Sequence, residues 1–265
     1  MLANLRQVFR YRALISSLVA RELKARYRGS VLGFLWTFVN PLLLLAIYTF
    51  VFTVVMPGAR GDSRVEPYPL FLFSGILPWT WFQASLVESC SVLIAGGNLI
   101  RKVLFPAEVL PIVTVLTGLV NFCLGLVILA AFVLYAGVPV QVRDLAWLPV
   151  IVLVQLTLTL GLALLLSSLT VHFRDLRDLL GNVLTLWFWA TPILYSLSQV
   201  PGRFRTMLTL NPFTHLAVAY QDVLVLDTPF RAWPQLLALG GVSLAVLWLG
   251  YFVFDRLRDT LAEEV

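Results

Sequence analysis

The sequence predicts an all-α integral membrane protein with six transmembrane helices and an amphipathic helix at the N-terminus. Of the 265 residues, 60% are hydrophobic and 12% are charged, whereas a soluble domain carries about 25% charged residues. The mean hydropathy is +0.90. This composition excludes a soluble enzyme, a nucleic-acid-binding domain and a disordered chain, so we expect membrane partners and no nucleic acid.

Six charge-free runs define the expected spans. A helix needs about 20 apolar residues to cross ~30 Å of hydrocarbon, and each run holds at least 21 residues. The runs are 29–59, 67–87, 109–142, 145–173, 179–202 and 232–254. They predict spans at about 31–56, 69–95, 109–136, 147–171, 179–198 and 232–254. Pro41, Pro78 and Pro192 lie inside three of them, where a missing amide donor bends or interrupts a helix.

No repeat or linker divides the chain, so one domain is expected. Residues 1–30 would form a cytoplasmic interface helix, residues 31–255 the six-span membrane domain and residues 256–265 a cytoplasmic tail. The first 28 residues carry 7 of the 19 Lys and Arg. Apolar residues recur there on one helical face, and Arg21, Lys24 and Arg28 fall on another. This pattern predicts a basic helix lying in the membrane surface; a simple positive anchor is the alternative.

The distribution of Lys and Arg sets the expected orientation. With the N-terminus inside, the inner segments carry 13 of these residues and the outer loops carry 6. Positive charge gathers on the cytoplasmic side of membrane proteins. Both termini are therefore expected to be cytoplasmic. This orientation depends on the N-terminal segment, because the remaining inner segments and the outer loops carry six Lys and Arg residues each.

No catalytic constellation is apparent in the sequence. It has no HExxH, GxSxG, CxxC or phosphate-binding GxxxxGK[ST] motif, so we expect no enzyme activity and no cofactor in this chain. His172 and His215 are placed on opposite sides of the membrane, which makes a shared metal site improbable. Glu88 is the one ionisable residue inside a span, and it either pairs near the membrane surface or meets substrate.

Aromatic residues concentrate in the first, second and fifth spans. Such residues form belts at the membrane surface, or they line a path for a glycan, because aromatic faces stack on sugar rings. The channel-lining candidates are Trp36, Tyr48, Trp79, Trp81, Phe82, Trp187, Phe188, Trp189 and Tyr195.

The segment 96–108 is the most distinctive link between spans. Gly96 and Gly97 can end a helix, and Asn98 can cap a new one. Apolar residues from Leu99 onward recur at helical spacing, with Arg101 and Lys102 on another side. The segment is either a stiff cytoplasmic helix that transmits motion from a soluble partner or a plain hairpin loop.

Three sets of motifs resemble a known family. They are LVARELKARYRGSVLGFLW at 18–36 with Asn40-Pro41; FSGILPW at 73–79 with GNLIRKVLFP at 97–106 and Leu110-Pro111; and PILY at 192–195 with LNPF at 210–213. Over nearly its whole length the sequence resembles the permease subunits of ABC-2 type exporters of O-antigen, teichoic acid and related polysaccharides. Ala107 departs from the family, which often has a basic residue before the glutamate.

The resemblance implies a type V exporter-like fold with short re-entrant helices at 192–222, before the last span. It implies a homodimer bound to two copies of a cytoplasmic ATPase, which would bind ATP and Mg, in the bacterial inner membrane. The cargo would be a lipid-linked polysaccharide such as O-antigen, moved from the cytoplasmic to the outer side. Residues 11–28 would be the interface helix, with Arg21, Glu22, Lys24 and Arg28. Residues 97–106 would be the coupling helix; the ATPase-coupling candidates are Asn98, Leu99, Arg101, Lys102, Phe105 and Glu108.

Three rival interpretations remain from the sequence. The first is an ABC-2 permease for a drug or a lipid. The second is an ion-coupled secondary carrier, which would need no ATPase. The third is a membrane-embedded transferase, which should carry a polar catalytic cluster at one membrane face.

Overall fold

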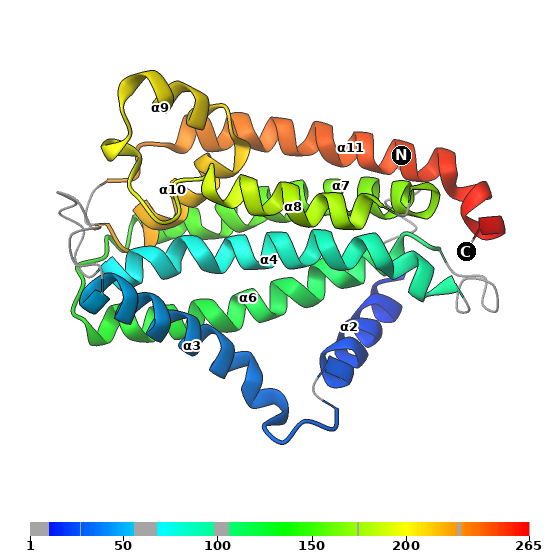
Figure 1. Cartoon of the computed structure of the whole chain (residues 1–265), viewed down its shortest axis with the longest axis horizontal. Helices are drawn as coiled ribbons and strands as arrows, with labels where there is room; N and C mark the ends of the chain where they lie inside the picture. Colours follow the sequence, from blue (N-terminus) through cyan, green and yellow to red (C-terminus); the bar gives the residue numbers. More distant parts are fainter. Residues whose placement is uncertain are drawn as a thin grey trace.

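The computed structural model describes residues 11–26, 28–55, 68–97, 106–173, 175–226 and 229–264. Within these ranges the chain forms helices joined by turns, with no β-strand (Figure 1). The predicted all-α class is therefore confirmed for the described part of the chain.

Within the described ranges, four helices are long and apolar enough to cross a membrane. They are α4 (Tyr68–Ala95), α6 (Val109–Tyr135), α7 (Leu148–His172, preceded by the 3-10 turn η4, Asp144–Trp147) and α11 (Trp233–Glu264). They match the predicted second, third, fourth and sixth spans. Helix α11 continues beyond the expected end at residue 254, so most of the expected tail is helical.

The predicted first span is a shorter helix than expected. Helix α3 (Trp36–Phe50) follows the 3-10 turn η1 (Gly33–Leu35) and continues into a π-helical turn, η2 (Val51–Val55). It begins at Trp36 rather than at residue 31 because Gly29 and Gly33 adopt φ angles of +80° and +49°, a conformation that ends right-handed helical geometry.

The predicted fifth span is also short. Helix α8 (Leu176–Trp189) has 14 residues and rises about 21 Å, less than the ~30 Å of a hydrocarbon core. The expected end at residue 198 is wrong, because the residue before a proline disfavours helical geometry and Pro192 follows closely. Six spans therefore remain a prediction.

Helix α4 lies at the centre of the bundle. It contacts α3, α6, α7 and α8, and also α10 (Pro212–Leu224) (Figure 1). Its aromatic side chains fill the core, and Phe82 and Leu93 are fully buried. Helix α11 packs along α7, which is the most extensive helix pair among the described residues.

The two ends of the bundle differ. Helix α2 (Arg12–Arg26) and the C-terminal end of α11 lie at one end, which we call the α2 end (Figure 1). The short helices α9 (Gly202–Thr209) and α10 lie at the opposite end, the α10 end. Helix α3 diverges from α4 and α6 toward the link with α2 (Figure 1). The cytoplasmic orientation of both termini stays a prediction.

Candidate transport site and partner-facing end

Among the described residues, an apolar contact and an ion pair attach helix α2 to the membrane domain. Ile15 and Leu18 are buried against Val109 and Val113 at the start of α6. The spacing of Ile15 and Leu18 places both on one side of α2. The two-faced character that the sequence predicted therefore serves to pack α2 against α6. Glu22 and the predicted basic residues lie away from this contact and are partly or fully exposed.

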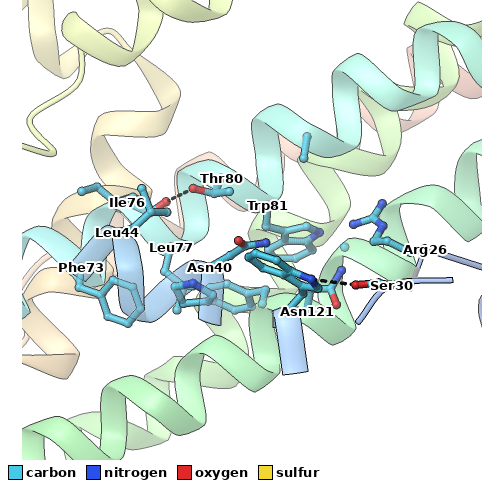
Figure 2. Close-up of a pocket in the computed structure, with 15 residues that line it drawn as sticks. Arg26, Ser30, Asn40, Leu44, Phe73, Ile76, Leu77, Thr80, Trp81 and Asn121 are labelled. Atoms are coloured by element: carbon cyan, nitrogen blue, oxygen red, sulfur yellow. Dashed lines mark hydrogen bonds between the residues drawn. The ribbon is translucent and has the colours of Figure 1, made fainter. Parts of the chain in front are cut away.

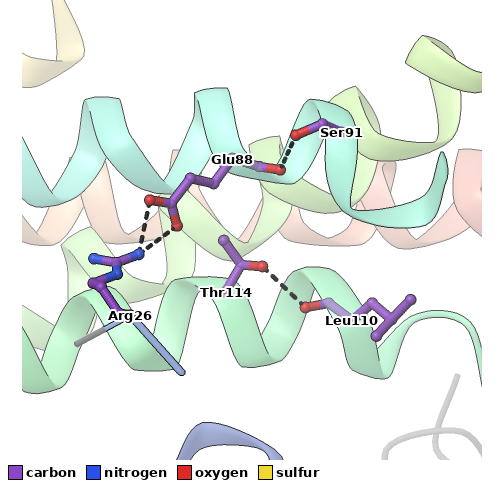
Figure 3. Close-up of polar contacts among 5 residues, drawn as sticks. All are labelled: Arg26, Glu88, Ser91, Leu110 and Thr114. Atoms are coloured by element: carbon purple, nitrogen blue, oxygen red, sulfur yellow. Dashed lines mark hydrogen bonds and ion pairs between the residues drawn. The ribbon is translucent and has the colours of Figure 1, made fainter. Parts of the chain in front are cut away.

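The second attachment joins Arg26 to Glu88 of α4. One guanidinium nitrogen of Arg26 donates to both carboxylate oxygens of Glu88, at 2.8 and 2.9 Å (Figure 3). Both side chains are partly exposed. Glu88 is therefore ion-paired, and its partner lies 62 positions away; its predicted place near the membrane surface stays a prediction. No local pattern in the sequence links the two residues, because Arg26 lies on α2, outside the predicted spans.

The predicted coupling segment, residues 97–106, is described only at its edges. Asn98, Leu99, Arg101, Lys102 and Phe105 lie outside the described residues. Glu108 is described: it precedes the first turn of α6 and is 2% exposed. Its carboxylate lies 3.8 Å from a guanidinium nitrogen of Arg258 on α11. Glu108 therefore faces the bundle rather than a docking surface.

The predicted channel aromatics divide into separate groups. Trp79 and Phe82 are buried and pack edge-on against Trp187, at ring-centroid distances of 6.2 and 5.5 Å. Phe213 of α10 lies 4.8 Å from Trp79. This cluster joins α4, α8 and α10 inside one subunit. Phe188 lies at its edge, 5.7 Å from Trp79.

The remaining aromatics lie at the margin of that cluster or apart from it. Trp189 is 63% exposed at the end of α8; its ring packs edge-on against Phe188 at a centroid distance of 5.6 Å, and the hydroxyl of Tyr195 donates to its carbonyl oxygen. Tyr48 of α3 stacks on Phe52. Trp36 and Trp81 line a cavity on the other side of α4. The nine candidates therefore do not form one continuous surface in a single subunit.

The cavity at Trp36 and Trp81 has a volume of about 460 Å³ and lies between α3, α4 and α6 (Figure 2). Its α4 wall is a helical stripe of residues 73, 76, 77, 80, 81 and 84. Arg26, Ser30, Asn40 and Asn121 also line it. Trp36 and Trp81 had been predicted to line a channel. Arg26, Ser30 and Asn40 lie within the family motifs but had no such role assigned to them, and Asn121 lies outside these motifs.

The α10 end is held together by Asn211. Its amide oxygen accepts hydrogen bonds from the indole nitrogen of Trp187 at 2.7 Å and from the backbone of Phe213 at 2.9 Å. Its amide nitrogen donates to the hydroxyl of Thr191 at 2.9 Å. Asn211 thus caps α10 and ties it to the end of α8. This position was part of the LNPF motif, but its role is visible only in three dimensions.

Comparison with known proteins decides the family. The family model described as ABC-2 type transporter matches residues 13–225. The chain belongs to the ABC-2 type transporter family.

Similar ABC-2 proteins match almost end to end. The chain is 42% identical over 268 residues to the O-antigen export system permease protein RfbA of Myxococcus xanthus, covering 100% of both chains. It is 31% identical to the RfbA protein of Klebsiella pneumoniae, over 92% of this chain and 91% of that one. The polysialic acid transport protein KpsM of Escherichia coli is 21% identical over 93% of this chain and 94% of its own. The predicted family is therefore confirmed.

Proposed function

We propose that this chain is the permease subunit of an ATP-driven exporter that moves a lipid-linked polysaccharide, such as O-antigen, outward across the bacterial inner membrane. The observation that carries the proposal is the end-to-end similarity to an O-antigen export permease, at 42% identity. Two further relatives are named for the export of O-antigen or the transport of polysialic acid. A polar glycan cannot cross hydrocarbon unaided, so a protein path is required.

The subunit would act as a homodimer. Leu43, Ile47 and Phe50 form an exposed apolar stripe on α3, and Leu179, Val183 and Leu186 form another on α8. Helix α3 packs on α4 and α6, and α8 packs on α4 and α7, which leaves both stripes uncovered. A second copy could cover these stripes and enclose the path. In this arrangement the short helices α9 and α10 would be the re-entrant elements at its outer mouth.

Energy would come from two copies of a cytoplasmic ATPase, which bind ATP and Mg. Residues 97–106 would dock on that partner, through Asn98, Leu99, Arg101, Lys102 and Phe105. Glu108 would hold the base of the segment, since its carboxylate faces Arg258. The basic residues Arg21, Lys24 and Arg28 of the interface helix, with Glu22, would lie at the same cytoplasmic surface. Movement of the docked segment would pass directly into α4 and α6, which flank it.

The test is complementation of a strain that lacks the permease, with surface glycan as the readout. Arg101→Ala, Lys102→Ala and Phe105→Ala should each lower export, and they should lower the ATPase rate of the purified complex. Arg143→Ala is the matched control, because Arg143 is exposed and follows the opposite, C-terminal end of α6. Unchanged export in all three variants would show that the coupling assignment is wrong.

The rival substrates are separated by the cargo that stimulates ATP hydrolysis. A glycan exporter should respond to a lipid-linked oligosaccharide and not to a drug or to a phospholipid. An ion-coupled carrier should transport without any ATPase, which reconstitution of the chain alone would reveal. Trp189→Ala offers a second probe, because its exposed ring could stack on a passing sugar without disturbing the core.

A further inference from the structure

The cavity between α3, α4 and α6 changes in character from one end to the other. Figure 2 shows Phe73, Ile76 and Leu77 at one end, and Asn121, Ser30 and Arg26 at the other. Asn40 and Thr80 lie between them (Figure 2). The residues of the α4 wall span positions 73–84, so the cavity extends about 16 Å along the helix axis. It is a slot with one polar end and one apolar end.

The slot is aligned with the expected membrane. Helix α4 has 28 residues and is about 42 Å long, so it extends about 6 Å beyond a ~30 Å hydrocarbon core on each side. Glu88 is seven residues from the end of α4, or about 10 Å. The Arg26–Glu88 pair therefore lies near the boundary between headgroups and hydrocarbon. The apolar end of the slot lies deeper.

Two polar groups at the headgroup end suit a particular ligand. A guanidinium donates charge-assisted hydrogen bonds to the oxygens of a phosphate as it does to those of a carboxylate. The carboxylate of Glu88 thus occupies a place on Arg26 that a phosphate could take. The amide oxygen of Asn121 is buried and has no hydrogen-bond partner among the described residues. An oxygen acceptor needs a hydroxyl or amide donor, which an ionised phosphate does not supply.

We propose that this slot binds the membrane-anchored end of the exported glycan. The lipid chain lies along Phe73, Ile76 and Leu77, its phosphate on Arg26 and a sugar hydroxyl on Asn121. This inference rests on the proposed function, because it takes the cargo to be a lipid-linked glycan. It adds a binding site within each subunit, beside the path between subunits.

Glu88 acts in this site as a competitor that the ligand must displace. Both members of the ion pair are partly exposed, and exposed pairs contribute little stability, so a phosphate can replace the carboxylate. A lipid with a weakly charged or zwitterionic head competes poorly. Selection against ordinary lipids thus comes from a repulsive element as well as from attraction.

The test measures binding by the full-length chain in phosphatidylcholine nanodiscs. The probe is a fluorescent polyprenyl phosphate that carries one hexose. Arg26→Gln should weaken binding by about tenfold or more, since it removes a charge-assisted hydrogen bond. Glu88→Gln should tighten binding by about two- to fivefold, since it frees Arg26. A purely structural ion pair predicts the same direction for both variants, and that result would overturn the proposal.

Matched variants complete the experiment. Arg143→Gln and Asp255→Asn make the same charge changes at exposed sites away from the slot and should bind like the wild type. Asn121→Leu should weaken binding of the hexose probe but not of polyprenyl phosphate alone. Equal affinity for dioleoylphosphatidylglycerol would assign the slot to bulk lipid and refute the proposal. If Arg26→Gln does not fold, Glu88→Gln still tests the proposal, because only the proposed competition predicts tighter binding of the probe by that variant.

The two proposals can fail separately. If cells export glycan through the wild-type chain while neither variant changes probe affinity, only the slot assignment fails. If no glycan is exported but another cargo is, the proposed function fails, and the binding data show independently whether the slot takes a phosphate-bearing lipid.

Discussion

The contact between α7 and α11 predicts a large effect from adding a single methyl group. A Cβ atom built on Gly250 would lie 2.1 Å from the carbonyl oxygen of Gly161. A Cβ built on Gly161 would lie 2.6 Å from the backbone nitrogen of Leu247. The obstructing atoms belong to the backbone and cannot rotate away. The two helices would have to separate by roughly 1 Å, in an interior packed like a crystal.

The expected cost follows from that separation. Overpacking of a close-packed interface costs about 1–3 kcal/mol, and the separation also removes dispersion contacts along both helices. Gly250→Ala and Gly161→Ala should each lower the free energy of unfolding by about 2–3 kcal/mol. The double variant should cost less than the sum, because one separation relieves both clashes.

The assay is unfolding of the purified chain by sodium dodecyl sulfate in mixed micelles, followed by tryptophan fluorescence. Gly241→Ala on α11 is the matched control, because a Cβ there meets no atom within 4 Å. It should be neutral, or stabilising by up to about 1 kcal/mol through helix propensity. The reasoning is refuted if Gly250→Ala and Gly161→Ala unfold at the same detergent fraction as Gly241→Ala.

Three other predictions concern the α10 end and the aromatic cluster. Burial, followed by repulsion from Asp144, raises the pKa of Asp222 from 3.8 to about 6. The folded state therefore binds this proton more tightly than the unfolded state does. The free energy of unfolding of the wild type should rise by up to about 3 kcal/mol as the pH falls from 7 to 4. Asp222→Asn should abolish that gain in thermal unfolding at several pH values. Asn211→Ala should lower the free energy of unfolding by about 1–2 kcal/mol through loss of a cap, measured in the same detergent assay. Trp79→Ala should cost about 3–5 kcal/mol, whereas Trp189→Ala should leave stability unchanged and slow export.

Each of these predictions has its own contrary outcome. A pH profile of Asp222→Asn parallel to that of the wild type would assign the pH dependence to other groups. Full stability of Asn211→Ala would mean that α10 is held by its apolar face alone. Normal export with Trp189→Ala would remove Trp189 from the glycan path.

The four long helices could be predicted because a membrane span depends on the length and apolarity of one continuous segment of sequence. A charge-free run of sufficient length satisfies it wherever the run later packs, and α6 begins at the predicted residue 109. Shorter elements depend on local backbone chemistry instead. Gly29 and Gly33 delay the start of α3, and Pro192 stops α8 early, although the runs around them are as charge-free as the others.

The Arg26–Glu88 pair could not be predicted for a different reason. Its members are 62 positions apart, and Arg26 belongs to a helix outside the spans. Nothing in the spacing of α2 distinguishes Arg26 from its other basic residues. The distinction arises because Ile15 and Leu18 dock on α6, which brings the last turn of α2 to α4. A long-range contact of this kind is a consequence of packing and not of any local pattern.

The aromatic residues show where composition stops being informative in a membrane protein. Hydropathy separates lipid-soluble from water-soluble surface, but the interior of a helical bundle is as apolar as lipid. Hydropathy therefore does not distinguish Trp79 from Trp189, yet Trp79 is 2% exposed and Trp189 is 63% exposed. For Trp79 to touch a glycan, α10 would have to withdraw Phe213 from its ring, 4.8 Å away. Trp189 needs no such movement, so among these two the exposed ring is the one that can meet cargo without unfolding part of the subunit.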